Sequence, residues 1–431
     1  MVSILFMMTV MLAGGAADPQ PARAEAPTQA PAPTPPVYEL GDIIDLTLKR
    51  NPAVAGAEGV VEQSRGRQVA AGAYLNPSIS GNSGQGFLKD TGRAAIGEDP
   101  NVIQSITEYN VTVGQPLEWP AKRAARRRAA EAGVAGAGAV LDETRLTLVA
   151  EVKLAFFHML LAQREAELAR QNLATVEQVA KAVAVRVKSG ESPQFEAIKA
   201  DVEVLKANQV VTKSQNAVRV ARVSLDTLTA GALGALFTLR GDFDSFHRGA
   251  GLDQLTVQAL DRHPTIRRLA KQVEQAGFVL AHERESRVPN VTVNGSYWRE
   301  IGREAFSAGL SVPTPLWYQR QGEITEAFGA MRQQEAEWLR ARNELVRAVT
   351  QHYQDAKTAA EQIEVFERGL LKQAQEALRI AQFSFQQGTA SLLEVLDAQR
   401  VYRQTQLEYA QARYELSIAR AKLERSVGGT L

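Results

Sequence analysis

Apolar residues recur at alternating spacings of four and three residues along two long stretches of the chain. From Leu148 to Val187 every position of this repeat is apolar, and most of these side chains are alanine or valine. The second stretch is looser and has the positions Leu345, Val349, His352, Ala356, Ala359, Ile363, Phe366, Leu370, Gln373, Ala377 and Ile380. A sustained period of about 3.5 residues predicts helices that supercoil against a partner. Proline is absent between Pro120 and Pro193 and after Pro315, so we expect rods much longer than the helices of a compact enzyme.

A second pattern, in which apolar and polar residues alternate, predicts two β-hairpins, one after Pro77 and one after Pro289. The apolar positions are Tyr109, Val111 and Val113 in the first hairpin, and Val291, Val293, Tyr297, Phe306, Ala308, Leu310 and Val312 in the second. This period suits a membrane β-barrel strand, and equally a half-buried strand of a soluble sheet. Four strands with unpaired edges cannot sit in hydrocarbon. In a membrane, several chains would therefore have to join, and three chains would supply twelve strands.

The two halves of the chain are related by an internal repeat. Five positions recur 212 residues later: Leu40, Pro52, Glu62, Gln63 and Pro77 correspond to Leu252, Pro264, Glu274, Gln275 and Pro289. Three more recur 198 residues later: Gly190, Glu196 and Ala200 correspond to Gly388, Glu394 and Ala398. Each copy is predicted to contain a helix, a hairpin, a very long helix, a tight turn and a long helix. We expect the first structural repeat at residues 38–250 and the second at 251–431, in a fold that is mainly α with a small β part.

The longest apolar run lies at the N-terminus, from Val2 to Ala17, and the small-residue pattern Ala22-Arg23-Ala24 follows it. The run is short for a transmembrane helix. We therefore interpret residues 1–24 as a secretory signal peptide, with an uncleaved anchor as the alternative. Residues 25–37 form a linker rich in proline and alanine. No later segment is expected to form a transmembrane helix.

Composition excludes several classes of protein. The 431 residues include no cysteine, and 49 basic against 48 acidic residues give a formal net charge of +1. Disulfides, thiolate metal sites and a cysteine nucleophile are excluded, and no net positive field attracts nucleic acid. The five histidines lack zinc-binding spacing, and no nucleotide-binding or hydrolase motif occurs. We expect a protein that is not an enzyme and that has no cofactor and no metal ligands.

A basic cluster follows the first hairpin and consists of Lys122, Arg123, Arg126, Arg127 and Arg128. A nucleic-acid site is one interpretation of such a cluster. No aromatic stacking residues are interleaved, however, and the N-terminus predicts export. We favour a helix start that is held by salt bridges or faces an interface, just below the barrel.

The layout as a whole resembles the TolC family of outer-membrane channel proteins. The residues that carry the resemblance are GTASLLEVLDAQ at 388–399, GESPQFEAIKA at 190–200, the NP and HP turns at 51–52 and 263–264, and the LNP and VPN segments at 75–77 and 288–290. Two further segments look like the heavy-metal efflux branch of the family, of cobalt–zinc–cadmium type. They are QPLEWPAKRAARRRAAE at 115–131 and VPTPLWYQRQGEI at 312–324.

The resemblance implies a homotrimer in the bacterial outer membrane, with its helical part in the periplasm. Its strands would form a common 12-stranded β-barrel in contact with outer-membrane lipid, and its long helices a periplasmic α-barrel. A periplasmic membrane-fusion adaptor and an inner-membrane pump of the resistance-nodulation-division type would be its partners. The channel would passively conduct divalent heavy-metal cations and do no chemistry.

Two carboxylates lie just after the predicted turn at Gly388. Glu394 and Asp397 are three residues apart and share one helix face. The resemblance puts the family's aperture carboxylates at these positions, where threefold symmetry would stack them as two cation-attracting rings at the periplasmic mouth. The alternative is a solvated pair favoured by the helix dipole. In the first repeat, Glu196 corresponds to Glu394, and Lys199 stands where Asp397 would be.

The predicted helix–helix tips carry further candidate residues. Gly190 and Gly388 are expected to permit tight helix reversals, and the resemblance makes the tips the adaptor-docking surface. In some family members an arginine just after the tip Gly-Thr ties neighbouring helices together. Here that position is Ala390, so a different contact must close the channel.

Aromatic residues flank the ends of the hairpins: Trp119, Trp298, Trp317 and Tyr318. They suit an aromatic belt at a membrane interface, with ordinary core packing as the alternative for each. Three functions thus stay open at this point: a channel for heavy-metal cations, a channel of the same fold for drugs or organic solutes, and a soluble periplasmic coiled-coil scaffold. The alternating hairpins argue against the scaffold.

Overall fold

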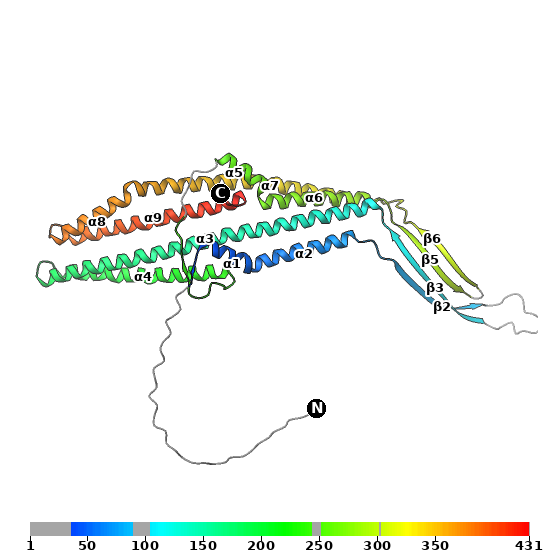
Figure 1. The fold of residues 1–431 in the computed structure, drawn as a ribbon, viewed down its shortest axis with the longest axis horizontal. Coiled ribbons are helices and arrows are strands. Elements are labelled where there is room, and N and C mark those ends of the chain that lie inside the picture. The colour runs from blue at the N-terminus through cyan, green and yellow to red at the C-terminus, as the bar shows by residue number, and fades with distance from the viewer. Residues whose placement is uncertain (1–35, 89–103, 244–250, 301–302, 431) are drawn as a thin grey trace, which may run out of the picture.

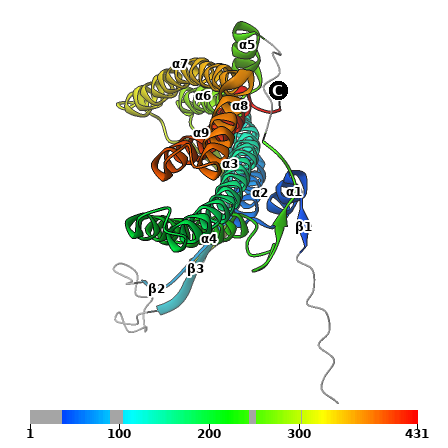
Figure 2. The same ribbon diagram turned by 90° about the vertical axis from the view of Figure 1, so that its left-hand side faces the viewer.

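The computed structural model describes residues 36–88, 104–243, 251–300 and 303–430. The expected signal peptide at residues 1–24 and most of the linker lie outside this part. The molecule is elongated, with long helices at one end and a small sheet at the other (Figure 1). Viewed from the helical end, α4, α3 and α7 follow a curved layer (Figure 2).

The first repeat contains β1 (Val37–Tyr38), α1 (Leu40–Arg50), α2 (Pro52–Gly72), β2 (Ser78–Leu88), β3 (Gln104–Leu117), α3 (Pro120–Lys188), α4 (Gln194–Leu228) and β4 (Thr238–Leu239). The second contains α5 (Leu252–Arg262), α6 (Pro264–Glu285), β5 (Val291–Glu300), β6 (Arg303–Ser311), α7 (Gln321–Val365), the π-helical turn η1 (Phe366–Leu370), α8 (Leu371–Gln386) and α9 (Leu392–Val427). The order of elements confirms the expected duplication and the mainly α fold with a small β part.

The start of α2 and the start of α6 reproduce the repeat in atomic detail. Both helices begin with proline at the first helical position, where the missing N–H costs nothing. The residue before each proline caps its helix. Asn51 Oδ1 accepts the N–H of Ala53 at 2.9 Å, and His263 Nδ1 accepts the N–H of Thr265 at 3.2 Å. Asn51 also donates its Nδ2 to the carbonyl of Leu228, which ties α2 to the end of α4.

Helix α3 is the spine of the molecule, and its 69 residues span about 100 Å. It packs against α4, α2, α6 and α9. The predicted heptad seam is confirmed, since no seam position from Leu148 to Val187 is exposed and Val152, Met159 and Val183 are fully buried. By length and composition alone α3 could also cross a membrane, which the sequence analysis did not expect. Its packing against these helices and against α1 explains its apolar character instead.

The second rod departs from the predicted seam at η1. There the N–H of Leu371 bonds to the carbonyl of Phe366, five residues back, and Gly369 leaves helical geometry with φ 169° and ψ −24°. A π-turn inserts one residue into the helical repeat and kinks the rod. The prediction is therefore wrong beyond this turn. The exposed positions are Leu370, Gln373, Ala377 and Ile380, and the buried or half-buried ones are each one residue later: Leu371, Ala374, Leu378 and Ala381.

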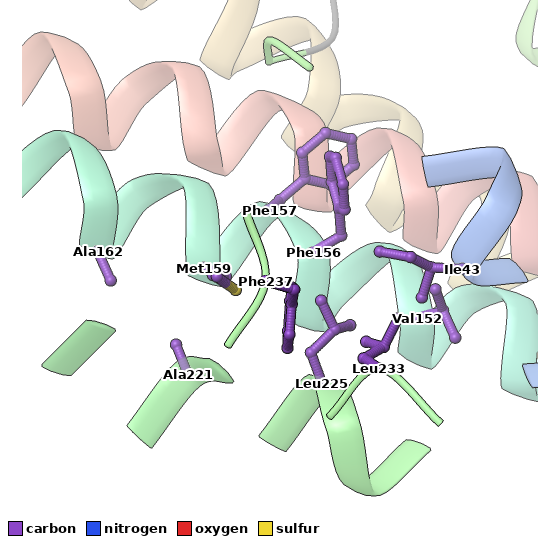
Figure 3. Close-up of a cluster of buried hydrophobic side chains, with 10 residues drawn as sticks. All are labelled: Ile43, Val152, Phe156, Phe157, Met159, Ala162, Ala221, Leu225, Leu233 and Phe237. Atoms are coloured by element: carbon purple, nitrogen blue, oxygen red, sulfur yellow. The ribbon is translucent and has the colours of Figure 1, made fainter. Parts of the chain in front are cut away.

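A hydrophobic core holds the middle of the molecule together. Val152, Phe156 and Met159 of α3 meet Leu225 of α4 and Phe237, which lies just before β4 (Figure 3). Each such side chain contributes about 1.5–3 kcal/mol when it is fully buried. This cluster anchors the connection between the two repeats to the spine.

We predict that Asn51→Ala lowers the free energy of unfolding by about 1–2 kcal/mol, because it removes both the cap of α2 and the hydrogen bond to Leu228. Thermal unfolding followed by circular dichroism in detergent measures the change. Asn51→Ser keeps a capping oxygen but has no amide donor, so we expect an intermediate loss. If Asn51→Ala unfolds at the wild-type temperature, this link does not stabilise the fold.

Candidate functional site

The four-stranded antiparallel sheet has the order β2–β3–β5–β6, so β2 and β6 are its edges. Its register gathers apolar side chains on one face: Ile79, Tyr109, Val111, Val113, Val293, Tyr297, Phe306 and Leu310. This apolar face is strongly exposed, with Ile79 at 76%, Leu310 at 72% and Phe306 at 84%. In a soluble protein such a face would be covered.

The opposite face of the sheet is polar and less exposed. Thr112 and Ser296 are half-buried and share a hydrogen bond of 2.8 Å between their hydroxyl groups. The side chain of Thr112 also donates to Asn110 Oδ1 at 2.8 Å. The sheet is therefore inside out relative to a soluble one, with an exposed apolar face and a polar face that is half-buried along its two central strands. This arrangement suits strands that separate lipid from a water-filled lumen.

The aromatic residues of the sheet form a row on the apolar face. The rings of Tyr109 and Tyr297 lie 5.8 Å apart, and those of Tyr297 and Phe306 lie 4.8 Å apart, centroid to centroid. Trp298 is different, because it lies opposite Asn110 and Ala305 and therefore on the polar face. On this register Trp298 does not share a face with the aromatic row, and its place in an interface belt stays a prediction. Sequence analysis missed the row because its residues come from three strands.

The other three candidate belt residues lie where the strands pass into the helices. Trp119 immediately precedes α3, and Trp317 and Tyr318 lie between β6 and α7. All three are exposed, and Trp317 reaches 92%. Core packing, the alternative reading, does not describe these side chains in the single chain. The hydroxyl of Tyr318 donates to Glu323 in the first turn of α7, at 2.5 Å.

The basic cluster after β3 joins the sheet to the helices. Arg123 donates to the carbonyl of Gly72 at 2.8 and 2.6 Å, and Arg126 donates to the carbonyl of Ala71 at 2.9 Å. These carbonyls belong to the last turn of α2 and have no partner within the helix. The guanidinium groups therefore supply the missing donors and place positive charge at the negative end of the helix dipole. Arg126 also pairs with the buried carboxylate of Glu118 at 2.7 Å. The cluster is thus a structural joint, as the sequence analysis favoured.

Lys122 completes this joint on the side of the second repeat. Its Nζ donates to Asn290 Oδ1 at 2.8 Å and to the carbonyl of Val288 at 3.1 Å. Burial lowers the pKa of Lys122. A lysine enclosed in this way is held by fixed acceptors, and it is not available to an external anion.

The far ends of the rods form two equivalent tips. Gly190 and Gly388 adopt φ values of 79° and 76°, as expected for helix reversals that only glycine makes cheaply. The hydrogen bonds around them repeat as well: Glu191 N–H to the carbonyl of Arg186 and Thr389 N–H to the carbonyl of Ser384, both 2.9 Å. This is the Schellman arrangement of a helix C-terminus. The two tips lie side by side (Figure 1) and share a small apolar cluster.

One arginine links the two tips. Nη1 of Arg186, near the end of α3, donates to the carbonyl of Phe385 in α8 at 3.1 Å. Its guanidinium carbon lies 5.0 Å from the centroid of the Phe385 ring, and its Nε lies 3.7 Å from the carboxylate of Glu191. Sequence analysis missed this residue, because a basic side chain in the last helical turn is common for reasons of the helix dipole alone.

The candidate gate carboxylates lie at the start of the helices that leave the tips. Glu394 is exposed, and its Oε2 accepts the N–H of Ser391 at 2.7 Å in a capping box. Asp397 is exposed too and forms an ion pair with Arg400. Glu196 lies in the first turn of α4 and is half-buried. Glu394 thus has a structural role in its own helix, which does not prevent its charge from acting on a lumen.

A groove of about 680 Å³ runs beside Asp397 between α3, α4 and α9. Its charged lining consists of Lys199, Glu203, Lys206, Asp397, Arg400 and Arg403. Cations outnumber carboxylates in this lining, so Asp397 sits in more basic surroundings than its spacing from Glu394 suggests. Gln399 is 5% exposed on the groove, where its Nε2 donates to Asn172 Oδ1 at 3.1 Å.

The described part of the chain holds no group of three or more histidine and carboxylate side chains placed to bind a metal ion. Among the histidines, His282 contacts the carbonyl of Lys122, His352 contacts Ser426, and His263 caps α6. These three side chains have structural partners.

Comparison with known proteins gives one family and several relatives. The family model described as "Outer membrane efflux protein" matches residues 43–231 and 255–429. The cobalt-zinc-cadmium resistance protein CzcC of Cupriavidus metallidurans is 25% identical over 315 residues, which are 73% of this chain and 75% of that protein. The pyoverdine export outer membrane protein OpmQ of Pseudomonas aeruginosa is 24% identical over 415 residues, covering 90% and 84%. The crystal structure of CusC superposes with a TM-score of 0.76 at 17% identity, covering 90% of this chain and 92% of that one.

We predict that Arg186→Ala separates the two tips. The chain contains no native cysteine, so spin labels can be attached at Ser189→Cys and Gln387→Cys, and their distance measured by double electron–electron resonance. Loss of the hydrogen bond to Phe385 should broaden the distance distribution and lengthen its mean. Arg186→Lys keeps the charge but not the planar fork, so its effect should be smaller. An unchanged distribution in Arg186→Ala would show that the apolar cluster alone holds the tips.

Proposed function

This chain belongs to the outer membrane efflux protein family and is an outer-membrane efflux channel of the TolC type, and from that premise we propose that three copies form one duct for divalent heavy-metal cations. The duct works with a periplasmic adaptor and an inner-membrane pump of the resistance-nodulation-division type. The protein is a passive channel and not an enzyme. The observation that carries the proposal is the inside-out sheet with its two open edges.

The open edges support an assembly of at least three chains. Strands β2 and β6 each leave a row of backbone N–H and C=O groups that hydrocarbon cannot satisfy. Edge-to-edge joining of identical sheets removes both edges. Two copies would give eight strands, a number whose barrel interior side chains fill, whereas wider barrels leave an aqueous channel. Three copies form the smallest ring whose barrel is wider than eight strands.

The height of the apolar band supports membrane insertion. Ten residues separate Tyr109, in the aromatic row, from Trp119 at the helical end of the sheet. At about 3.3 Å per residue and a strand tilt of about 40°, this is a height of about 25 Å, the height of the apolar band of outer-membrane barrels. A soluble periplasmic scaffold would have no reason to expose such a band to water.

The helices at the two lateral edges of the tips also support association. Helix α4 packs against α3, and helix α8 packs against α9. Exposed apolar residues at three- and four-residue spacing line α4: Phe195, Ile198, Val202 and Leu205. Exposed apolar residues also line the outer side of η1 and α8: Leu370, Ile380 and Phe383. Two apolar stripes on opposite edges of one chain are complementary to each other in a closed ring.

Two cargo classes are consistent with the relatives. CzcC, named for cobalt, zinc and cadmium resistance, and OpmQ, named for pyoverdine export, match at nearly equal identity. We favour metal cations because Glu394 and Asp397 would add six carboxylates to the mouth of a trimer. Such rings raise the local concentration of cations without binding them tightly. Export of organic solutes by the same duct is the second candidate, supported by the longer match to OpmQ.

We further propose that the tips at Gly190 and Gly388 dock the adaptor. Both turns are exposed at the far end of the helical part and share one geometry. A trimer would present six such tips, which is a suitable surface for a ring of helical partners. In this assembly the helical part lies in the periplasm.

We predict that Glu394→Gln with Asp397→Asn lowers the preference of the channel for cations over anions, because six charges leave the mouth while side-chain size is kept. Reversal potentials in a planar bilayer under a salt gradient measure this preference. Glu415→Gln, an exposed position farther along α9, is the matched control and should leave the preference unchanged. Equal ion selectivity in all variants would remove the carboxylate rings from the proposal.

We predict that a strain lacking this gene becomes more sensitive to zinc, cobalt, cadmium or nickel salts, because the duct is the exit of the efflux system. Growth in graded concentrations of metals and drugs measures the change, and the wild-type gene on a plasmid should restore tolerance. Sensitivity to drugs or siderophore stress without any change toward metals would support the second cargo class instead.

A further inference from the structure

Trp298 differs in size and in chemistry from its neighbours on the polar face of the sheet. Among the described side chains of the polar face, it is the one aromatic residue. Its neighbours on this face of β3, β5 and β6 are small or polar: Asn110, Thr112, Thr292, Asn294, Ser296, Ala305 and Ser307. The indole of Trp298 is half-buried and is much larger than the hydroxyl, amide and methyl groups around it. It therefore changes the cross-section of whatever space the polar face borders.

The position of Trp298 along the strand puts it near the end of the β5–β6 hairpin that is farthest from the helices. Strand β5 runs from Val291, next to the helical end, to Glu300, and Trp298 lies two residues before that end. Its partner Ala305 lies at the corresponding end of β6, whereas its partner Asn110 lies in the middle of β3, which continues six residues farther, to Gln104. In the proposed duct this end of the barrel opens to the cell exterior.

Several charged residues lie close to Trp298 in the register of the polar face. The guanidinium carbon of Arg303, the first residue of β6, lies 5.7 Å from the centroid of the Trp298 ring. Arg303 pairs with Glu300 in the register, and both share the polar face with Trp298. Glu108 shares this face too, and its carboxylate lies over Gly86, where an added Cβ would come within 2.0 Å of Oε1. The cation–π contact with Arg303 thus holds the ring from one side.

We propose that Trp298, braced by Arg303, is a second selection point of the duct, an aromatic constriction at its outward end. The proposal rests on the trimeric barrel, in which the threefold axis brings three indoles to one level of the lumen. It restricts bulky organic solutes by size, whereas small hydrated ions pass. Below this level the small polar residues of the same face leave the lumen wide.

Cysteine accessibility tests the proposal without depending on the state of the helix tips. The chain has no native cysteine, and Thr292 lies on the polar face six residues farther in than Trp298. Intact cells that carry Thr292→Cys are treated from outside with a small charged thiol reagent and with a bulky polymer-linked maleimide. We expect Trp298→Ala to speed labelling by the bulky reagent on the order of tenfold, with little change for the small one. Trp298→Phe should stay close to the wild type.

Two matched variants locate the effect. Phe306→Ala removes an aromatic ring from the apolar face at nearly the same level of the sheet and should leave labelling of Thr292→Cys unchanged. Glu300→Cys lies outward of Trp298, so its labelling should not depend on the indole. Equal bulky-reagent rates at Thr292→Cys with and without Trp298 would overturn the constriction. If the wild-type background labels equally fast with both reagents, the polar face borders no enclosed lumen, and the proposed duct itself is overturned.

Discussion

A backbone amide in hydrocarbon has no water with which to bond, and this constraint governs the whole molecule. The chain exposes an apolar sheet face that requires lipid, yet the sheet ends in two unpaired strands. Lipid on the face and satisfied bonds at the edges are compatible only if identical sheets close on one another. In the proposed ring the helices would follow the circumference that the strands set, because α3 begins shortly after β3 and α7 follows β6.

The long helices meet this demand through their apolar seams. In α3 the seam is dense in alanine, so neighbouring backbones approach closely and the rod runs unbroken from the joint to the tip. The second rod is interrupted at η1, where one inserted residue turns the buried stripe of α8 away from that of α7. The rod of the first repeat is thus straight and that of the second is bent. The bend brings both tips together, although α3 and α7 begin at different places.

Much of this architecture could be predicted from the sequence, because the hydrophobic periods and the internal repeat can be recognised from individual residues. The seam of α3, the strand alternation, the duplicated helix starts at Pro52 and Pro264, and the glycine turns all follow from local rules. The family resemblance carried the rest of the layout. The errors of the sequence analysis have a common origin: a shift of one residue moves a side chain to another side of its helix or strand. The π-turn shifts the seam of α8 by one position, and one step along β5, from Tyr297 to Trp298, changes from the apolar face to the polar face. The clasp of Arg186 on Phe385 joins residues 199 positions apart, a contact for which no local pattern exists.

The two capping residues of the duplicated helix starts differ in one chemical respect. Asn51 is neutral at every pH, whereas the cap of α6 is an imidazole that must be unprotonated at Nδ1 to accept the N–H of Thr265. Burial lowers the pKa of His263, so the folded chain binds fewer protons there than the unfolded chain does. Its contribution to stability is therefore complete above the ordinary histidine range and declines as the surroundings acidify. The two equivalent helix starts therefore differ in their response to pH: the cap of α6 weakens in acid, whereas the cap of α2 does not.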